Sequence, residues 1–142
     1  MKVLECSSKG DKRFSAFYAR VKVYGKLDSI ENHYQLSKRF GTVVPRTWKD
    51  AKGKQPTHFC VGNVNFEVEH LTAFYKLLWY KYLRANPPLI DYANQFDDFN
   101  DIFKSTKSLN CQADVIRQYI KEGPDSILRD CEEFLALLRK NE

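Results

Sequence analysis

Several signals that usually identify a protein class are missing from this chain of 142 residues. No apolar run approaches the roughly 20 residues that a membrane-spanning helix requires, and the first residues lack the hydrophobic core of a secretion signal. The four cysteines are widely separated and include no Cys-x-x-Cys pair, a pattern typical of reduced thiols in a chain without a secretion signal. We therefore expect a cytoplasmic protein without a membrane partner.

Motifs for metals and for nucleotide phosphates are missing as well. His58 and Cys60 have a spacing that metal ligands use, but no second ligand pair follows, so we predict no metal and no other cofactor. The polar loop 7–13 contains no Walker motif. Its backbone amides, with Lys9 and Arg13, are candidates for a phosphate contact; a plain surface loop is the alternative.

The chain does contain enough apolar residues for one packed domain, which we place at 1–142. Hydrophobic residues make up 43% and aromatic residues 14%, which excludes a disordered tail. The net charge of +5 is uneven, because residues 1–56 hold 13 Lys/Arg against 5 Asp/Glu, whereas 57–142 hold 10 against 13. A basic half favours an anionic partner, such as the phosphates of a nucleotide or nucleic acid. Ordinary solubilising charge is the alternative.

The hydrophobic periodicity predicts a mainly α (α+β) fold, a single compact helical domain with a small N-terminal β element. The β element comprises 3–6, the alternating segment 17–24 and a hairpin that turns at Gly62-Asn63. The predicted helices begin at Asp28, cover 71–82, 89–94 and 113–120, and begin again at Pro124. Segments 40–57 and 96–103 are predicted to be irregular, apart from one turn at 47–51.

The helix that begins at Asp28 carries the most informative side chains. At 3.6 residues per turn, Glu31, Gln35 and Lys38 project from one stripe. A proton donor or acceptor beside an amine nucleophile is suited to chemistry on a phosphorylated small molecule. In the alternative interpretation, Glu31 completes a capping box with Asp28, and Lys38 is a solvated amine at the helix C-terminus.

Other candidates also have two interpretations. Tyr34 and Phe17 are either core residues or groups that stack on a ligand. Asp98 and Asp101 belong either to a solvated loop or to a clamp for ribose hydroxyls. Asn110 is either a ligand contact or the N-cap of the helix that follows it.

Four segments recur in the order found in one known family. Phe14-Ser15-Ala16-Phe17 is similar to Phe-Ser-Asn-Phe, and 31–38 is similar to Glu-His-Tyr-x-Gln-x-x-Lys. Segment 83–89 is similar to Phe-x-Gln-Asn-Pro-x-Leu, and the segment that begins at Asn110 to Asn-x-Leu-Gly-x-x-Leu. Together the four cover roughly residues 14–120 and resemble the NADAR (YbiA-like) family, whose members cleave N-glycosidic bonds in ADP-ribose-type or ribosylamino compounds.

The departures from this pattern indicate a divergent branch. The acidic-Trp-Gly loop of the family has only 97–101 as its counterpart, without Trp or Gly. Tyr82 stands where the family has Lys, Asn32 replaces His, and Ala113 replaces Gly. The resemblance therefore does not identify the substrate.

The resemblance implies an N-glycosidase-like hydrolase that acts on an ADP-ribosyl or ribosylamino-phosphate compound, ADP-ribosylated guanine or nucleic acid included. Glu31 would be the catalytic acid/base at the anomeric carbon, and Lys38 would either trap the opened sugar as an imine or hold a phosphate. Burial beside Tyr34 would lower the pKa of Lys38, whereas Glu31 would raise it. The other substrate-binding candidates are Lys9, Arg13, Phe17, Arg20, Tyr34, Gln35, Arg39, Asp98, Asp101 and Asn110.

Two other functions compete with this hypothesis. A catalytically silent ADP-ribose- or nucleotide-binding module, or an inhibitor, would keep the pocket and lose the reaction. A basic nucleic-acid-binding domain would bind DNA or RNA in a strongly salt-dependent way. The oligomeric state is left open.

Overall fold

The computed structural model describes residues 1–104 and 110–141, which form a mainly helical α+β domain, as predicted. The strands are β1 (Val3–Glu5), β2 (Arg20–Val23), β3 (Lys26–Ser29), β4 (Lys38–Arg39), β5 (His58–Val61), β6 (Val64–Glu67) and β7 (Asp98–Asn100). The helices are α1 (Ile30–Ser37), α2 (Trp48–Ala51), α3 (Leu71–Arg84), α4 (Pro87–Ala93), α5 (Gln112–Glu122), α6 (Pro124–Asp130) and α7 (Glu132–Lys140), with 3-10 turns at Lys12–Phe14 and Val68–His70. No helix in these two ranges is long and apolar enough to cross a membrane.

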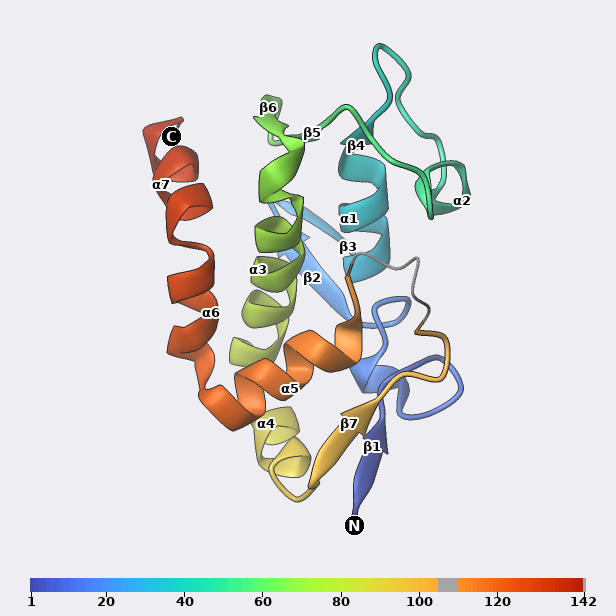
Figure 1. The fold of residues 1–142 in the computed structure, drawn as a ribbon, viewed down its shortest axis with the longest axis vertical. Helices are drawn as coiled ribbons and strands as arrows, with labels where there is room; N and C mark the ends of the chain where they lie inside the picture. Colours follow the sequence, from blue (N-terminus) through green and yellow to red (C-terminus); the bar gives the residue numbers. More distant parts are fainter. Residues whose placement is uncertain (105–109, 142) are drawn as a thin grey trace.

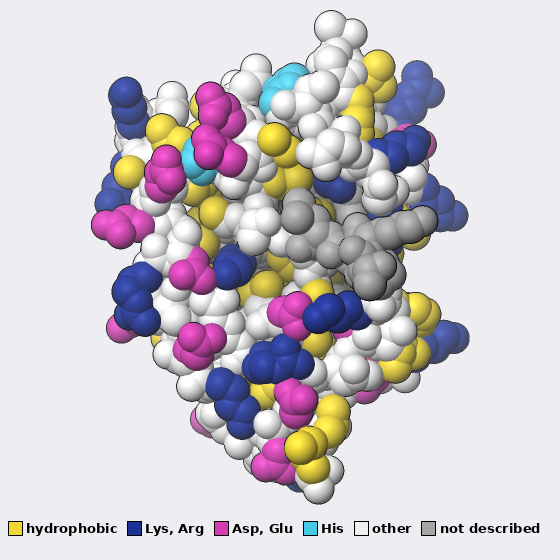
Figure 2. Space-filling model, viewed as in Figure 1, with side chains coloured by type: hydrophobic (Ala, Val, Ile, Leu, Met, Phe, Trp, Pro, Cys, Tyr) yellow, Lys and Arg dark blue, Asp and Glu magenta, His cyan; other side chains and the backbone are white. Residues whose placement is uncertain are grey.

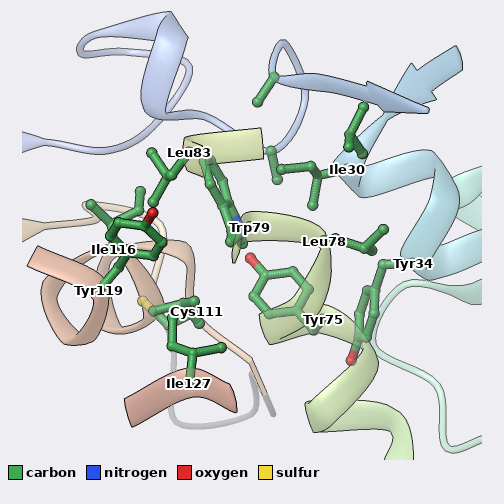
Figure 3. Close-up of a cluster of buried hydrophobic side chains, with 14 of the residues drawn as sticks. Ile30, Tyr34, Tyr75, Leu78, Trp79, Leu83, Cys111, Ile116, Tyr119 and Ile127 are labelled. Carbon is green, nitrogen blue, oxygen red and sulfur yellow. The ribbon is translucent and has the colours of Figure 1, made fainter. Parts of the chain in front are cut away.

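Helix α3 lies at the centre of the domain (Figure 1). It packs against α1 on one side, against α6 on the other and against α5, which crosses its C-terminal half. Its apolar stripe includes Tyr75, Leu78, Trp79 and Leu83, all buried, and Figure 3 shows these side chains between Ile30 of α1 and the residues of α5. The predicted 3.6-residue periodicity of this segment is confirmed, because the stripe faces the core along the whole helix.

The strands form three small sheets. β2 and β3 form an antiparallel hairpin, and β4, β5 and β6 form an antiparallel sheet in which the predicted turn at Gly62-Asn63 joins β5 to β6. β1 and β7 pair in parallel, with Leu4 opposite Phe99. The prediction that 96–103 is irregular is therefore wrong for 98–100, because a strand partner far away in sequence, β1, supplies the hydrogen bonds.

Helix α1 begins two residues later than predicted. Ser29 is its N-cap and accepts a hydrogen bond from the Asn32 N–H at 3.0 Å, whereas Asp28 belongs to β3. The predicted capping box of Asp28 and Glu31 is therefore wrong. The helix ends at Ser37 because Lys38 is extended (ψ 147°) and pairs with β5. Strand β3 directly precedes helix α1 and strand β4 directly follows it, so the two strands fix the direction of the side chains of α1.

The segment after Pro124 forms two helices where one was predicted. α6 ends at Asp130, and α7 begins at Glu132. Between them lies the buried Cys131, whose backbone is not helical (φ −100°, ψ 6°). This break lets α7 place Phe134 against the aromatic rings of β5, β6 and α3.

Candidate active site

A cavity of about 590 Å³ lies beside α1. Its walls are one side of α1, the segment 52–56 after α2, the first turns of α3, and the segments 101–104 and 110–112. The size is within the range of pockets that bind small molecules and cofactors. Of the predicted site residues, the cavity brings together Phe17, Glu31, Tyr34, Gln35, Lys38, Asp101 and Asn110.

Glu31 projects from the first turn of α1 into this cavity and is 6% exposed. Its Oε1 accepts a hydrogen bond from Gln35 Nε2 at 2.9 Å, one helical turn away. The same oxygen lies 3.4 Å from Nζ of Lys52. The Oε1 of Gln35 is buried and has no hydrogen-bond partner among the described residues. Glu31 is therefore held in place from two sides, and an amide oxygen beside it is left over.

Lys38 lies at the C-terminal end of α1 and is only 5% exposed. Its Nζ lies 5.1 Å from the centroid of the Tyr34 ring and donates a long hydrogen bond of 3.5 Å to the backbone carbonyl of Ala51. Burial lowers the pKa of Lys38; the Glu31 carboxylate opposes this shift, and the Lys52 ammonium adds to it. The structure thus answers the question left open by the sequence, because burial outweighs the attraction of Glu31. The interpretation of Lys38 as a solvated surface amine is wrong.

Tyr34 and Asn110 also line the cavity and contact each other. The Asn110 Nδ2 donates a hydrogen bond of 2.7 Å to the Tyr34 hydroxyl. Asn110 is not an N-cap, because Cys111 has that position in α5. Burial raises the pKa of Tyr34, a shift that the Asn110 hydrogen bond reduces. Figure 3 shows the Tyr34 ring beside Tyr75 of α3, with ring centroids 4.8 Å apart. Tyr34 is therefore both a core residue and part of the cavity wall.

The two acidic candidates lie in different surroundings. Asp101 lines the cavity and accepts a hydrogen bond from Gln112 Nε2 at 3.0 Å, and the Gln112 Oε1 accepts from the Ala16 N–H at 2.6 Å. These bonds join the Phe-Ser-Ala-Phe segment to α5 through one amide. Asp98 is outside the cavity and accepts a hydrogen bond of 2.8 Å from Arg117 Nε.

The predicted phosphate-binding cations do not line this cavity. Arg13 pairs with Asp11 at 2.7 Å. Arg20 donates to a backbone carbonyl of β3 at 3.3 Å, and Arg39 donates to backbone carbonyls at the end of α1 at 2.8, 3.2 and 2.9 Å. Lys9 lies in the loop before the first 3-10 turn. These side chains therefore have local structural roles or lie apart from Glu31 and Lys38.

Sequence reasoning missed the cations that do reach the cavity. Lys52 and Lys54 line it from the segment after α2, and Lys104 lines it from the segment after β7. For Lys52 and Lys54, the signal in the sequence was the basic stretch predicted to be irregular after α1, but that pattern does not show which way the side chains point. Lys104 lies in another segment and had no such signal. In Figure 2, Lys and Arg side chains predominate along the edge over α1 and α2, whereas acidic side chains gather over β6 and α7. The positive half of the sequence thus corresponds to the side of the molecule that carries α1.

The arrangement is suited to organic acid/base chemistry. Within 1–104 and 110–141, no three His, Cys, Asp or Glu side chains are grouped so that they could hold a metal ion. The cavity presents the carboxylates of Glu31 and Asp101, the buried amine of Lys38, side-chain amides and the Tyr34 hydroxyl, with further lysines at its edge.

Comparison with known proteins agrees with the resemblance in the motifs. No curated protein matches this chain. A sequence model described as DarT1-associated NADAR antitoxin matches residues 1–142. The match covers every segment that forms the cavity, and also α2 and the C-terminal helices, which the four motifs do not include. The chain therefore belongs to the NADAR family, in the group described as DarT1-associated NADAR antitoxins.

Proposed function

We propose that this chain is an antitoxin that hydrolyses an N-glycosidic bond formed by an ADP-ribosyl group. Family membership supports a role linked to ADP-ribosylation. The observation that carries the proposal is the position of Glu31 and Lys38: both project from the α1 segment into one cavity, and both are more than nine-tenths buried. Burial of a carboxylate and of an amine costs folding free energy. Such groups cluster at functional sites, which is why their position here supports a catalytic role.

Lys38 is the nucleophile in this mechanism. Because burial lowers its pKa, a larger fraction of the amine is free to attack at neutral pH than for an exposed lysine. Its lone pair forms a C–N bond to the anomeric carbon while the bond from that carbon to the leaving base breaks. Glu31 takes a proton from the attacking nitrogen and delivers it to the base.

The ribose ring then opens. The nitrogen of Lys38 forms a double bond to the anomeric carbon, the ring C–O bond breaks, and the ring oxygen receives a solvent proton through Glu31. Water adds to the iminium, and its collapse frees the amine, the aldehyde form of ADP-ribose and one proton. The overall reaction consumes one water and regenerates both side chains.

The remaining wall residues provide substrate contacts. The unpartnered Oε1 of Gln35 accepts a hydrogen bond from a ribose hydroxyl, and Asn110 and Asp101 are positioned for the others. Phe17 is 37% exposed at the edge of the cavity, where its ring offers a stacking surface. Lys54 neutralises phosphate charge, and Lys104, which pairs with Asp114 at 3.1 Å, lies at the edge of the same cavity.

Replacement of Glu31 by glutamine tests the acid/base step. We expect Glu31→Gln to slow the release of ADP-ribose from an oligonucleotide that carries ADP-ribosylated guanine by about 100-fold or more, with an unchanged melting temperature. Chromatography of the released nucleotide is the assay, and Glu132→Gln, which changes an exposed carboxylate on α7, is the control. Full activity in Glu31→Gln would remove Glu31 from the mechanism.

Reduction with borohydride during turnover tests the imine. Mass spectrometry should find an ADP-ribose adduct on Lys38, present in Lys49→Met, which changes a lysine outside the cavity lining, and missing in Lys38→Met. Cleavage without an adduct would assign Lys38 to phosphate binding. Recovery of intact substrate after hours with the wild-type protein would favour the binding-module hypothesis instead.

A further inference from the structure

The cavity contains an asymmetry between its two lysines. In the described part of the chain, Lys38 forms no ion pair, although it is 5% exposed, whereas Lys52 pairs with Glu31, although half of its side chain is in solvent. Electrostatics alone favour the opposite arrangement, because a buried ammonium gains more from a counterion than a hydrated one. The distribution of partners in this cavity therefore leaves the buried amine without a counterion.

The fold explains how Lys52 reaches this position. Helix α2 packs against α1, and the carbonyl of Ala51, the last residue of α2, meets Lys38 Nζ. The next residue, Lys52, then extends over the Phe17 ring, 5.5 Å from its centroid, and reaches Glu31 Oε1 at 3.4 Å. Two consecutive residues thus contact the amine and the carboxylate of the site.

We propose that Lys52 is a positioning residue that occupies the Glu31 carboxylate and thereby leaves the Lys38 amine without a counterion and available for attack. The proposal rests on the proposed function only for the role of Lys38 as nucleophile. Without Lys52, Glu31 Oε1 would keep only its bond from Gln35, and Lys38, whose charge already interacts with Glu31 across the same cavity, would be available as its partner. Pairing of Glu31 with Lys38 would stabilise the ammonium form and block attack.

The charge of Lys52 acts in the same direction. It lowers the pKa of Lys38 directly, in addition to the larger effect of burial, and an adjacent cation is a known means of activating an amine. The other titratable groups that face the cavity from its walls are Tyr34, Lys54, Tyr75, Asp101, Lys104 and Cys111. Those that influence Lys38 by charge are Glu31 and Lys52.

Competitive labelling of the free protein with acetic anhydride tests this role without any substrate. The acetylation of Lys38 is followed against pH by mass spectrometry. We expect Lys52→Met to move the midpoint of Lys38 labelling to higher pH by about one unit, so that labelling at a pH below the midpoint is about tenfold slower. Lys52→Arg keeps the charge and should restore the wild-type midpoint.

The matched control is Lys49→Met, because Lys49 lies over the ring of Trp48 and has no ion pair with Glu31 in the described structure. It should leave the midpoint unchanged. A Lys52 that merely joined α2 to α1 would lower the melting temperature of Lys52→Met without moving the Lys38 midpoint, and that result would overturn the proposal. If Lys52→Met does not fold, Lys52→Gln provides the same measurement.

The result is separable from the proposed function. Labelling reports the amine of Lys38 whether or not the protein cleaves a glycosidic bond. Where cleavage occurs, the pH at which borohydride traps half of the maximal adduct should move in the same direction in Lys52→Met. A shifted labelling midpoint in a protein without hydrolase activity would preserve the role of Lys52 and refute the proposed reaction.

Discussion

Replacement of Lys38 by methionine should stabilise the fold, although it removes the proposed nucleophile. The residue Lys38 is 5% exposed, and the only direct hydrogen bond of its Nζ in the described structure is the one of 3.5 Å to the Ala51 carbonyl. Its other favourable contact is a cation–π contact with the face of the Tyr34 ring. Methionine has a similar length and no charge to desolvate, so it fits the same space between Tyr34 and Ala51.

The expected gain follows from two opposing contributions. Replacement of a buried ion pair by apolar residues of similar volume often stabilises proteins by about 1–4 kcal/mol, and we take the same range for the buried ammonium of Lys38, which has no counterion to lose in the described structure. The lost interaction with the Tyr34 ring offsets about 1 kcal/mol of this gain. The net increase in the free energy of unfolding is therefore about 0–3 kcal/mol, which corresponds to a rise in melting temperature of up to roughly 10 °C for a chain of this size.

The stability difference between Lys38→Met and the wild type should depend on pH, which provides an internal check. Because burial lowers the pKa of Lys38 in the folded protein, the unfolded chain binds more protons in the window between the folded and unfolded pKa values. Wild-type stability therefore rises with pH through that window, up to the unfolded value of about 10.4. Lys38→Met lacks this titration, so its advantage should be largest near neutral pH and should shrink as the pH approaches 10.

Urea unfolding followed by circular dichroism at pH 7 and at pH 9.5 measures both effects. Lys54→Met is the control, because Lys54 is exposed in the same cavity wall and its replacement should change the stability little. A Lys38→Met protein less stable than the wild type at pH 7 would show that the ammonium is well compensated in the folded state. Lys38 would then not be the free amine that the proposed reaction requires.

Two further replacements test one contact in the cavity wall and one ion pair outside the cavity. Tyr34→Phe removes the acceptor of the 2.7 Å bond from Asn110 and should lower the free energy of unfolding by about 0.5–1.5 kcal/mol, measured by urea unfolding. Arg117→Met removes donors to Asp98 and to the Phe99 carbonyl. Because the Arg117 hydrogen bond lowers the pKa of Asp98, the associated stability is lost below about pH 4, and Arg117→Met should flatten that acid-induced loss in a pH series of melting curves.

The sequence predicted most of the helices because their stripes are local. The 71–82 pattern and the residues Gly123-Pro124 correspond to the observed α3 and to the boundary between α5 and α6. Strand β7 could not be found in this way, because three residues with no periodicity of their own become a strand only beside β1. The boundary of one domain at 1–142 stays a prediction.

For the site, sequence spacing was sufficient on one helix and insufficient between elements. Glu31 and Gln35 share a wall because helical geometry puts them there, and Lys38 lies on the same wall although it is extended at the start of β4. Their roles stay predictions. The sequence could not separate Arg39 from these residues, because no local pattern shows that its guanidinium donates to the carbonyls at the end of α1. Lys52 reaches Glu31 only because α2 folds back onto α1, which no local pattern encodes.

The buried polar groups of α1 that oppose folding lie in the cavity where the reaction is proposed. Along α1, the described structure leaves two polar groups underused: the Oε1 of Gln35 has no partner, and Lys38 Nζ has one long bond. Buried polar groups in this condition oppose folding, and a sequence selected for stability alone would replace both with apolar residues. Both line the cavity that contains Glu31. A ligand that carries hydroxyls and an electrophilic carbon would engage the amide oxygen and the amine at once, so the binding of that ligand would recover free energy that folding alone does not.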